Sequence, residues 1–295
     1  MGKNKQKDTN KLPNWQRKVS VRLLERSKQV YHTFTGSGID NLLFIFGCQR
    51  SGTTITQRIF EQDWNTKIYP EVASHLSKQD TKLGLRLDPV SDLKHEFSKQ
   101  KAPFVITKPL VESQNAQTLL KSFPGSKALW MYRHYGDVAA SKLKKSGMMS
   151  GVGDLRYIHK DVPNDWRNDQ ISDEVRHLVN QYFSEDMDGF DAAALYWYVR
   201  NQFYFQQDLA NSPNVMLVRY DDLVGDSANT IKRIYNFLER PFPGENILID
   251  VHKKSIGKGK HVSVSPSIQA LCDTMFQNLL EADQKNRKDP VGISA

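Results

Sequence analysis

The sequence predicts an α/β protein, a three-layer fold with a central parallel sheet of about five strands flanked by helices. Three observations support this prediction. Short apolar runs such as 42–46, 103–108 and 128–132 have the length and composition of strands that are buried on both faces. These runs alternate with segments of helical periodicity. The chain has 295 residues, 39% of them hydrophobic, which is enough to bury one substantial core, and no linker divides it.

Residues 1–38 form a basic tail and a helix, and residues 39–295 form a single predicted domain. Residues 1–13 are polar and rich in lysine, which predicts disorder. The apolar residues that follow lie on one helical stripe: Trp15, Val19, Leu23, Val30 and Phe34. This stripe favours a helix that packs on the domain. The basic residues beside it also suit a weak, reversible contact with a membrane surface, and that alternative stays open.

Most of the net positive charge lies in the same region. Residues 1–30 contain nine Lys or Arg residues against Asp8 and Glu25, which accounts for +7 of the net charge of +8. The rest of the chain is almost neutral, which argues against nucleic-acid binding. With only two cysteines, no apolar leader and no run of membrane-spanning length, the sequence predicts a cytoplasmic protein, peripheral to a membrane if the N-terminal helix binds one.

The stretch 41–60 predicts a phosphate-binding loop between a strand and a helix. Gly47 and Gly52 bracket a turn that contains Arg50, and helical periodicity begins at Thr53. The N–H groups and positive dipole end of such a helix favour an anion, and an arginine fork binds two anionic oxygens. The spacing of the two glycines matches the start of the P-loop pattern, but Thr53 and Thr54 replace its Lys and Ser or Thr. This difference weakens the hypothesis of a nucleotide kinase.

The other elements follow in chain order. Further strands are predicted at 66–69, 103–108, 128–132 and 215–219. Helices are predicted at 113–122, 137–145, 190–210, 227–239 and 267–281. Residues 77–102 show no sustained period and indicate a surface excursion. The insertion at 148–190 is irregular except for a helix at 171–183, and long irregular segments of this kind are typical of substrate-binding loops.

Three stretches carry a resemblance to a known family. GCQRSGTTI resembles the loop with which sulfotransferases bind the 5′-phosphosulfate of 3′-phosphoadenosine 5′-phosphosulfate (PAPS). KALWMYRHYGDVAAS resembles the family's second motif, an Arg at a strand end and a Ser eight residues later, here Arg133 and Ser141. NVMLVRYDDL resembles the late strand whose tyrosine, here Tyr220, lies near the adenine. The resemblance covers roughly 42–242, apart from the insertion at about 150–190.

This resemblance implies a P-loop-like fold, PAPS as co-substrate and no metal. It assigns the 5′-phosphate to Arg50, Ser51, Gly52, Thr53 and Thr54, the 3′-phosphate to Arg133 and Ser141, and the region of the adenine to Tyr220. The Gly- and Lys-rich stretch 252–266 departs from the family pattern. Ser255, Lys258 and Lys260 are therefore assigned to the nucleotide only provisionally, and a surface loop is the alternative.

The resemblance also implies the catalytic groups. Glu71, after the second strand, resembles the base of the tyrosyl-protein and carbohydrate branch, with His75 as the alternative base. Lys108 resembles the strand-end lysine that reaches the bridging oxygen, while Arg50 stabilises the leaving phosphate. The expected reaction is in-line transfer of a sulfuryl group to a hydroxyl of a saccharide, a tyrosine or a small alcohol. A P-loop kinase and a non-catalytic nucleotide-binding adaptor are the alternatives.

Overall fold

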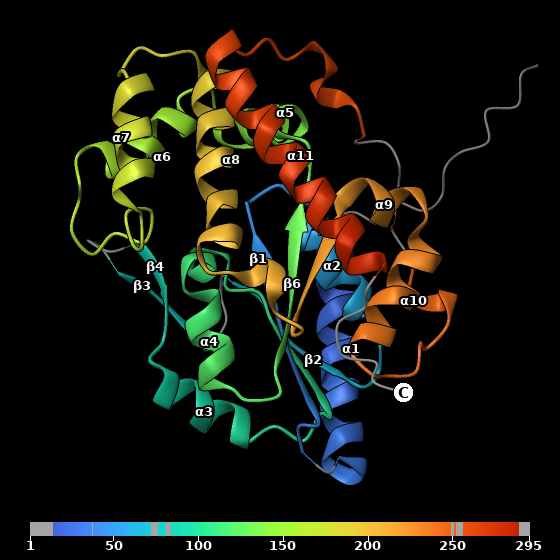
Figure 1. The fold of residues 1–295 in the computed structure, drawn as a ribbon. Coiled ribbons are helices and arrows are strands. Elements are labelled where there is room, and N and C mark those ends of the chain that lie inside the picture. The colour runs from blue at the N-terminus through green and yellow to red at the C-terminus, as the bar shows by residue number, and fades with distance from the viewer. Residues whose placement is uncertain are drawn as a thin grey trace, which may run out of the picture.

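The central sheet consists of five parallel strands. The computed structural model describes residues 14–36, 38–71, 76–80, 84–248, 251 and 256–288. The strands are β1 (Asn41–Gly47), β2 (Thr66–Tyr69), β5 (Phe104–Thr107), β6 (Lys127–Tyr132) and β7 (Val215–Arg219), arranged in the order β2-β5-β1-β6-β7 (Figure 1). Every neighbouring pair is parallel. The predicted parallel sheet is therefore confirmed, and all five carboxyl ends lie at one edge.

Helices cover both faces of this sheet and make the predicted third layer. Along β1, Leu43 and Ile45 face one cluster of buried side chains, while Phe44 and Phe46 face another. The first cluster includes residues of α2 (Thr53–Phe60) and α10 (Ser227–Phe237). The second includes residues of α4 (Ala116–Ser122), α8 (Gly189–Gln206) and α11 (Pro266–Lys288). Apolar residues on both sides of each strand explain the continuous apolar runs in the sequence.

The insertion at 148–190 is more regular than predicted. The structure contains α7 (Asp173–Tyr182), as expected, but also α6 (Ser150–His159), which the sequence analysis missed. Gly151 and Gly153 lower the helix propensity of this segment. Gly151 nevertheless packs closely on α8, where an added Cβ would lie 2.6 Å from the Ala193 nitrogen. Close packing on α8 therefore stabilises a helix that local preference disfavours.

The prediction of an irregular excursion at 77–102 is also wrong in part. Strands β3 (Ser77–Asp80) and β4 (Gly84–Leu87) form a small antiparallel sheet, and α3 (Val90–Ser98) follows. Leu93 and Phe97 lie one helical turn apart and are buried in the core. Two apolar anchors are enough to dock a helix of nine residues, although they are too few to give a clear period.

Several short elements follow the strand ends. Residues predicted to form one helix at 113–122 divide into the 3₁₀ turn η1 (Leu110–Asn115) and α4. After β6 comes α5 (Tyr135–Ser146), and after β7 comes α9 (Tyr220–Gly225), a helix that was not predicted. The turns η2 (Leu209–Asn211), η3 (Glu245–Ile247) and η5 (Lys258–His261) complete the described chain. The polar groups of the site lie mostly on these elements.

The N-terminal helix α1 (Asn14–Thr35) forms as predicted, but the part of its apolar stripe that the structure describes does not pack on the domain. Lys28 and His32 are buried instead, and Leu23, Val30 and Phe34 are exposed. The Lys28 Nζ donates to the Glu61 carbonyl at 2.7 Å and to the Thr66 Oγ1 at 3.0 Å. The end of α2 and the start of β2 thus offer α1 polar acceptors, which explains why a polar side of the helix faces inward. Residues 1–13 lie outside the described part of the chain.

Candidate active site

The phosphate loop, residues 47–54, connects β1 to α2 at the carboxyl edge of the sheet. The Ser51 N–H donates to the Cys48 carbonyl at 3.3 Å and closes the turn. Arg50 and Gly52 both have left-handed backbones, with φ of 73° and 99°. A Cβ at Gly52 would lie 2.4 Å from the Tyr220 ring, so only glycine permits this contact.

The start of α2 has no side-chain cap. Ile55 and Thr56 both donate their N–H groups to the Gly52 carbonyl. Ser51 is buried, and within the described residues its Oγ has no hydrogen-bond partner. Uncapped N–H groups and the positive end of the helix dipole favour an anion at this position.

Three groups that were predicted separately meet beside this loop. The Arg50 Nε donates to the Ser141 Oγ on α5 at 3.0 Å. Arg133, which follows β6, is buried, and its Cζ lies 4.2 Å from the centre of the Tyr220 ring. The structure therefore brings together the predicted 5′-phosphate, 3′-phosphate and adenine residues. Strands β1, β6 and β7 are neighbours, so the segments that follow them converge.

The electrostatics of this cluster favour an anion. Burial lowers the pKa of the Arg50 guanidinium, and the positive charge of Arg133 lowers it further. Two guanidinium groups in a partly buried site repel each other, and an anion between them would relieve the repulsion. Arg133 is partly compensated, because its Nη2 lies 3.0 Å from the Asp137 Oδ2.

Asp137 is a residue that the sequence analysis missed. Its carboxylate accepts hydrogen bonds from the Gly257 N–H at 3.1 Å and the Gly259 N–H at 2.5 Å. Gly259 also packs on Gly136 so closely that an added Cβ would lie 2.2 Å from the Gly136 carbonyl carbon. Asp137 therefore fastens the loop around Gly257 and Gly259, which we call the late glycine loop, to Arg133. Its place one helical turn after Arg133 was the available signal.

The late loop itself is described only in part. Lys258 is exposed, and its role at the nucleotide remains a prediction. For Lys260 only the backbone, in η5, is described, while Ser255 lies outside the described residues. The observed contacts of this loop with α5 come from glycine N–H groups.

The expected base and the lysine expected at the bridging oxygen follow neighbouring strands, Glu71 after β2 and Lys108 after β5. The Glu71 Oε1 accepts from the Val111 N–H at 3.0 Å, and the Lys108 Nζ lies 3.4 Å from the Thr54 Oγ1. Burial raises the pKa of the Glu71 carboxyl, against the opposing charge of Lys108. Burial likewise lowers the pKa of Lys108, against the opposing charge of Glu71. His75, the alternative base, lies outside the described residues.

A model of the sulfotransferase domain matches residues 40–288, which include all of these groups. The chain belongs to the sulfotransferase family. The match spans the sheet, the phosphate loop, the insertion and the last helix. No curated protein matches the chain.

Two solved structures are similar to this chain. The sulfotransferase domain from the curacin biosynthetic pathway is 14% identical, with a TM-score of 0.53, covering 83% of this chain and 99% of its own. A mouse sulfotransferase, SULT7A1, complexed with PAP is 14% identical, with a TM-score of 0.44, covering 90% and 93% of the two chains. Because the curacin-pathway domain is only 14% identical, it supports the fold of this sulfotransferase but not its substrate or its mechanism.

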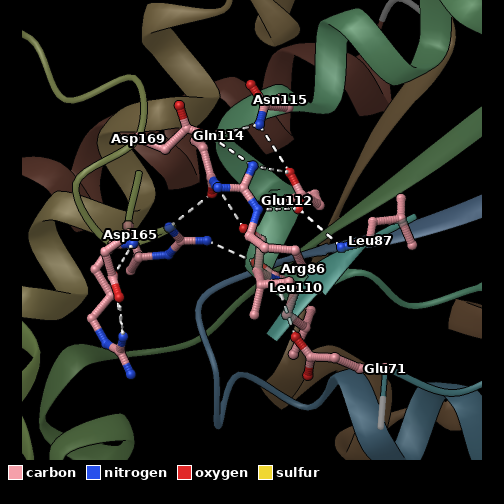
Figure 2. Close-up of polar contacts among 12 residues, drawn as sticks. Glu71, Arg86, Leu87, Leu110, Glu112, Gln114, Asn115, Asp165 and Asp169 are labelled. Carbon is pink, nitrogen blue, oxygen red and sulfur yellow. Dashed lines mark hydrogen bonds and ion pairs between the residues drawn. The ribbon is translucent and has the colours of Figure 1, made fainter. Parts of the chain in front are cut away.

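A polar network in this sulfotransferase surrounds η1, beside Glu71 (Figure 2). Glu112 is buried and accepts from the Arg86 Nε at 2.9 Å, the Leu87 N–H at 3.2 Å and the Asn115 Nδ2 at 2.9 Å. The Arg86 Nη2 also donates to the Asp169 Oδ2 at 3.1 Å. Glu112 thus joins the β3–β4 hairpin to the turn that contacts Glu71, and Arg86 joins the hairpin to the insertion.

Arg200 holds the same turn from the other side. This residue of α8 is fully buried, and it donates to the Leu110 carbonyl at 2.8 Å and to the Gln114 Oε1 at 3.1 Å. Its position in an apolar helix gave no signal in the sequence. Among the described residues, no group of three or more His, Cys, Asp or Glu side chains could hold a metal ion, and metal independence stays a prediction.

Proposed function

We propose that this sulfotransferase transfers a sulfuryl group from PAPS to a hydroxyl acceptor by in-line displacement. The observation that carries the proposal is the contact between Arg50 and Ser141 beside the buried Arg133. Motifs from two parts of the chain, expected to bind the two phosphate groups of one nucleotide, form a single positively charged cluster.

The donor would lie across the carboxyl ends of β1 and β6. The 5′-phosphosulfate would accept hydrogen bonds from the uncapped start of α2 and from Arg50. Arg133 and Ser141 would bind the 3′-phosphate. Tyr220, whose ring packs on both Gly52 and Arg133, supports the adenine end of the site.

The reaction requires positioning and fixed positive charge. Sulfuryl transfer resembles phosphoryl transfer, with a loose transition state in which charge accumulates on the leaving oxygen. Arg50 and the N–H groups of α2 would stabilise the leaving 5′-phosphate. Lys108 contacts Thr54 of the same loop, and from there it would reach the bridging oxygen.

Glu71 is the proposed base for the acceptor hydroxyl. A general base is most effective when its pKa lies near the working pH, and burial shifts the pKa of Glu71 in that direction. A glutamate after the phosphate loop is the arrangement of the tyrosyl-protein and carbohydrate branch, to which we assign this chain. The acceptor would be a saccharide, a tyrosine or a small alcohol bound near the insertion.

Calorimetry with 3′,5′-adenosine bisphosphate (PAP), the expected product, tests the donor site. We expect metal-independent binding that weakens by about 100-fold in Arg133→Ala, since charge-assisted hydrogen bonds contribute about 1.5–3 kcal/mol each. Arg156→Ala is the matched control, because Arg156 is an exposed arginine paired with Glu185 outside the site. Preference for ATP with magnesium over PAP would overturn the proposal in favour of a kinase.

Turnover is tested with labelled PAPS and three acceptor sets: tyrosine peptides, saccharides and small alcohols. If label is transferred to one acceptor set and Arg133→Ala abolishes this transfer, the result supports the proposed sulfotransferase activity. Tight PAP binding without transfer to any set would favour the nucleotide-binding adaptor.

A further inference from the structure

The outward side of α1 plays no part in the proposed chemistry. Its exposed apolar residues are Leu23 (59% exposed), Val30 (59%), Tyr31 (45%) and Phe34 (84%). Trp64, from the turn after α2, is 48% exposed and extends the group, since its ring centre lies 6.1 Å from that of Tyr31. We call these five residues the α1 apolar surface. Large apolar side chains gathered on an exposed surface are typical of interaction sites.

We propose that the α1 apolar surface binds reversibly to the surface of an anionic lipid bilayer. Helices that lie in a bilayer interface combine an apolar side carrying Leu, Phe or Trp with basic residues and a polar opposite side. Tyr and Trp are favoured at the level of the lipid headgroups. The α1 apolar surface has this composition, and Figure 1 shows α1 at the flank of the domain, near β2.

The orientation of α1 is set by polar anchors. Lys28 and His32 lie on the opposite side of the helix, 96% and 95% buried. The two hydrogen bonds of Lys28, to the Glu61 carbonyl and the Thr66 Oγ1, tie the helix to the end of α2 and the start of β2. Turning the apolar residues inward would break both bonds. The apolar surface therefore faces outward as long as α1 stays docked.

Charge identifies the occupant as an anionic surface. Residues 1–30 carry a net charge of +7, and the exposed Arg26 lies on α1 beside the apolar stripe. A second copy of the chain on this surface would bring two such segments together and repel. An anionic bilayer attracts them and accepts the apolar side chains as well. No helix in the described part of the chain has the length and apolarity to span a bilayer.

Co-sedimentation of the full chain with lipid vesicles tests this inference. We expect binding to vesicles of phosphatidylcholine mixed with phosphatidylserine, little binding to phosphatidylcholine alone, and loss of binding in high salt. Val30→Ser combined with Phe34→Ser should weaken binding at least about tenfold. Met148→Ser combined with Met149→Ser is the matched control, because these residues are also exposed and apolar but lie far from α1 in sequence.

Four outcomes would overturn the proposal. Three of them are equal sedimentation with both kinds of vesicle, unchanged binding in the α1 variant, and a dimer of the unmodified chain that the α1 variant abolishes. Binding to an acidic polypeptide such as polyglutamate, without binding to vesicles, would indicate a protein partner and also contradict it. PAP affinity is measured in parallel and should not change. Failure here therefore leaves the proposed sulfotransferase function intact, and failure of that function leaves this test intact.

Discussion

The proposed donor side and the proposed acceptor side of the site are built differently. On the donor side, the phosphate loop, Arg133 and Tyr220 each follow the end of a strand directly, and β1, β6 and β7 are neighbours in the sheet. On the acceptor side, the contacts around η1 join segments outside the sheet. Arg86 on β4 contacts Asp169 in the insertion, 83 residues later.

This difference follows from what each side has to recognise. Phosphate groups are bound by backbone N–H groups, a helix terminus and arginines, all of which a short strand-turn-helix motif supplies. An acceptor is recognised by its shape and hydroxyl positions, which requires side chains from several segments. The donor side should therefore tolerate changes around η1, whereas the acceptor side should not.

The largest expected effect is the loss of turnover in a Glu71 variant, which should affect the acceptor side and leave the donor side unchanged. Glu71→Gln keeps the size of the side chain and an oxygen for the Val111 N–H but removes the base, so turnover should fall by about 10²- to 10⁴-fold. PAP affinity by calorimetry should be unchanged. Loss of PAP binding, or turnover close to that of the unmodified chain, would contradict the assignment.

The same carboxyl predicts a pH dependence. The base works only when deprotonated, and burial raises the pKa of Glu71. Activity should therefore fall, as the pH is lowered, at a higher pH than for an ordinary glutamate. A profile of kcat/KM against pH measures this fall at acidic pH. The fall should be absent from the residual activity of Glu71→Gln.

A second test removes support for the acceptor side at Arg200. Arg200→Met removes the buried donor of the Gln114 Oε1, while the Leu110 carbonyl keeps its hydrogen bond from the Ser113 Oγ. We expect a loss of about 1–3 kcal/mol in the free energy of unfolding, from one unsatisfied acceptor. In the molecules that fold, turnover should fall more than PAP affinity. Arg156→Met, at an exposed ion pair, should leave the free energy of unfolding nearly unchanged.

Like the contacts around η1, the docking of α1 depends on a contact between distant segments, here made by Lys28. Burial lowers the pKa of Lys28 to about 8, from the ordinary value of 10.5. Below about pH 8 the amine is protonated in both the folded and unfolded states, and the full cost of burying its charge is present. Between about 8 and 10.5 the unfolded state binds more protons, so the free energy of unfolding rises with pH, by at most about 3 kcal/mol.

Denaturant unfolding over this pH range measures the effect. The free energy of the unmodified chain relative to Lys28→Met should rise as the pH increases from about 8 to 10.5. Subtracting the variant removes the titration of the other lysines. A flat difference would show that Lys28 is not buried as a charged group.

The smallest expected effect concerns two glycines of α6, in the insertion. Gly151→Ala places a Cβ 2.6 Å from the Ala193 nitrogen and should cost about 2 kcal/mol of unfolding free energy. Gly153 has nothing within 4 Å of an added Cβ, so Gly153→Ala should stabilise by about 0.5–1 kcal/mol. Thermal unfolding of both variants measures the difference. Equal effects would show that packing on α8 is not what positions α6.

The sequence by itself determined the sheet and the groups that follow its strands. The bounds of β2 and β7 agree with the prediction to the residue, and Arg50, Arg133 and Ser141 lie together as the two motifs predicted. These features are local. A strand buried on both faces needs a continuous apolar run, and a phosphate turn needs glycine at a left-handed position. Both requirements can be read within a few residues.

Tertiary structure decided the rest. The sequence identified the helix at α1 but not the side that packs, since the polar acceptors of Lys28 lie at the end of α2 and the start of β2. Asp137 received its role from the glycine loop that it fastens, and Glu112 from Arg86 and Leu87 on the β3–β4 hairpin. A buried polar side chain is stable only when a distant segment supplies its partner. No local pattern records that partner, so only the folded chain shows these contacts.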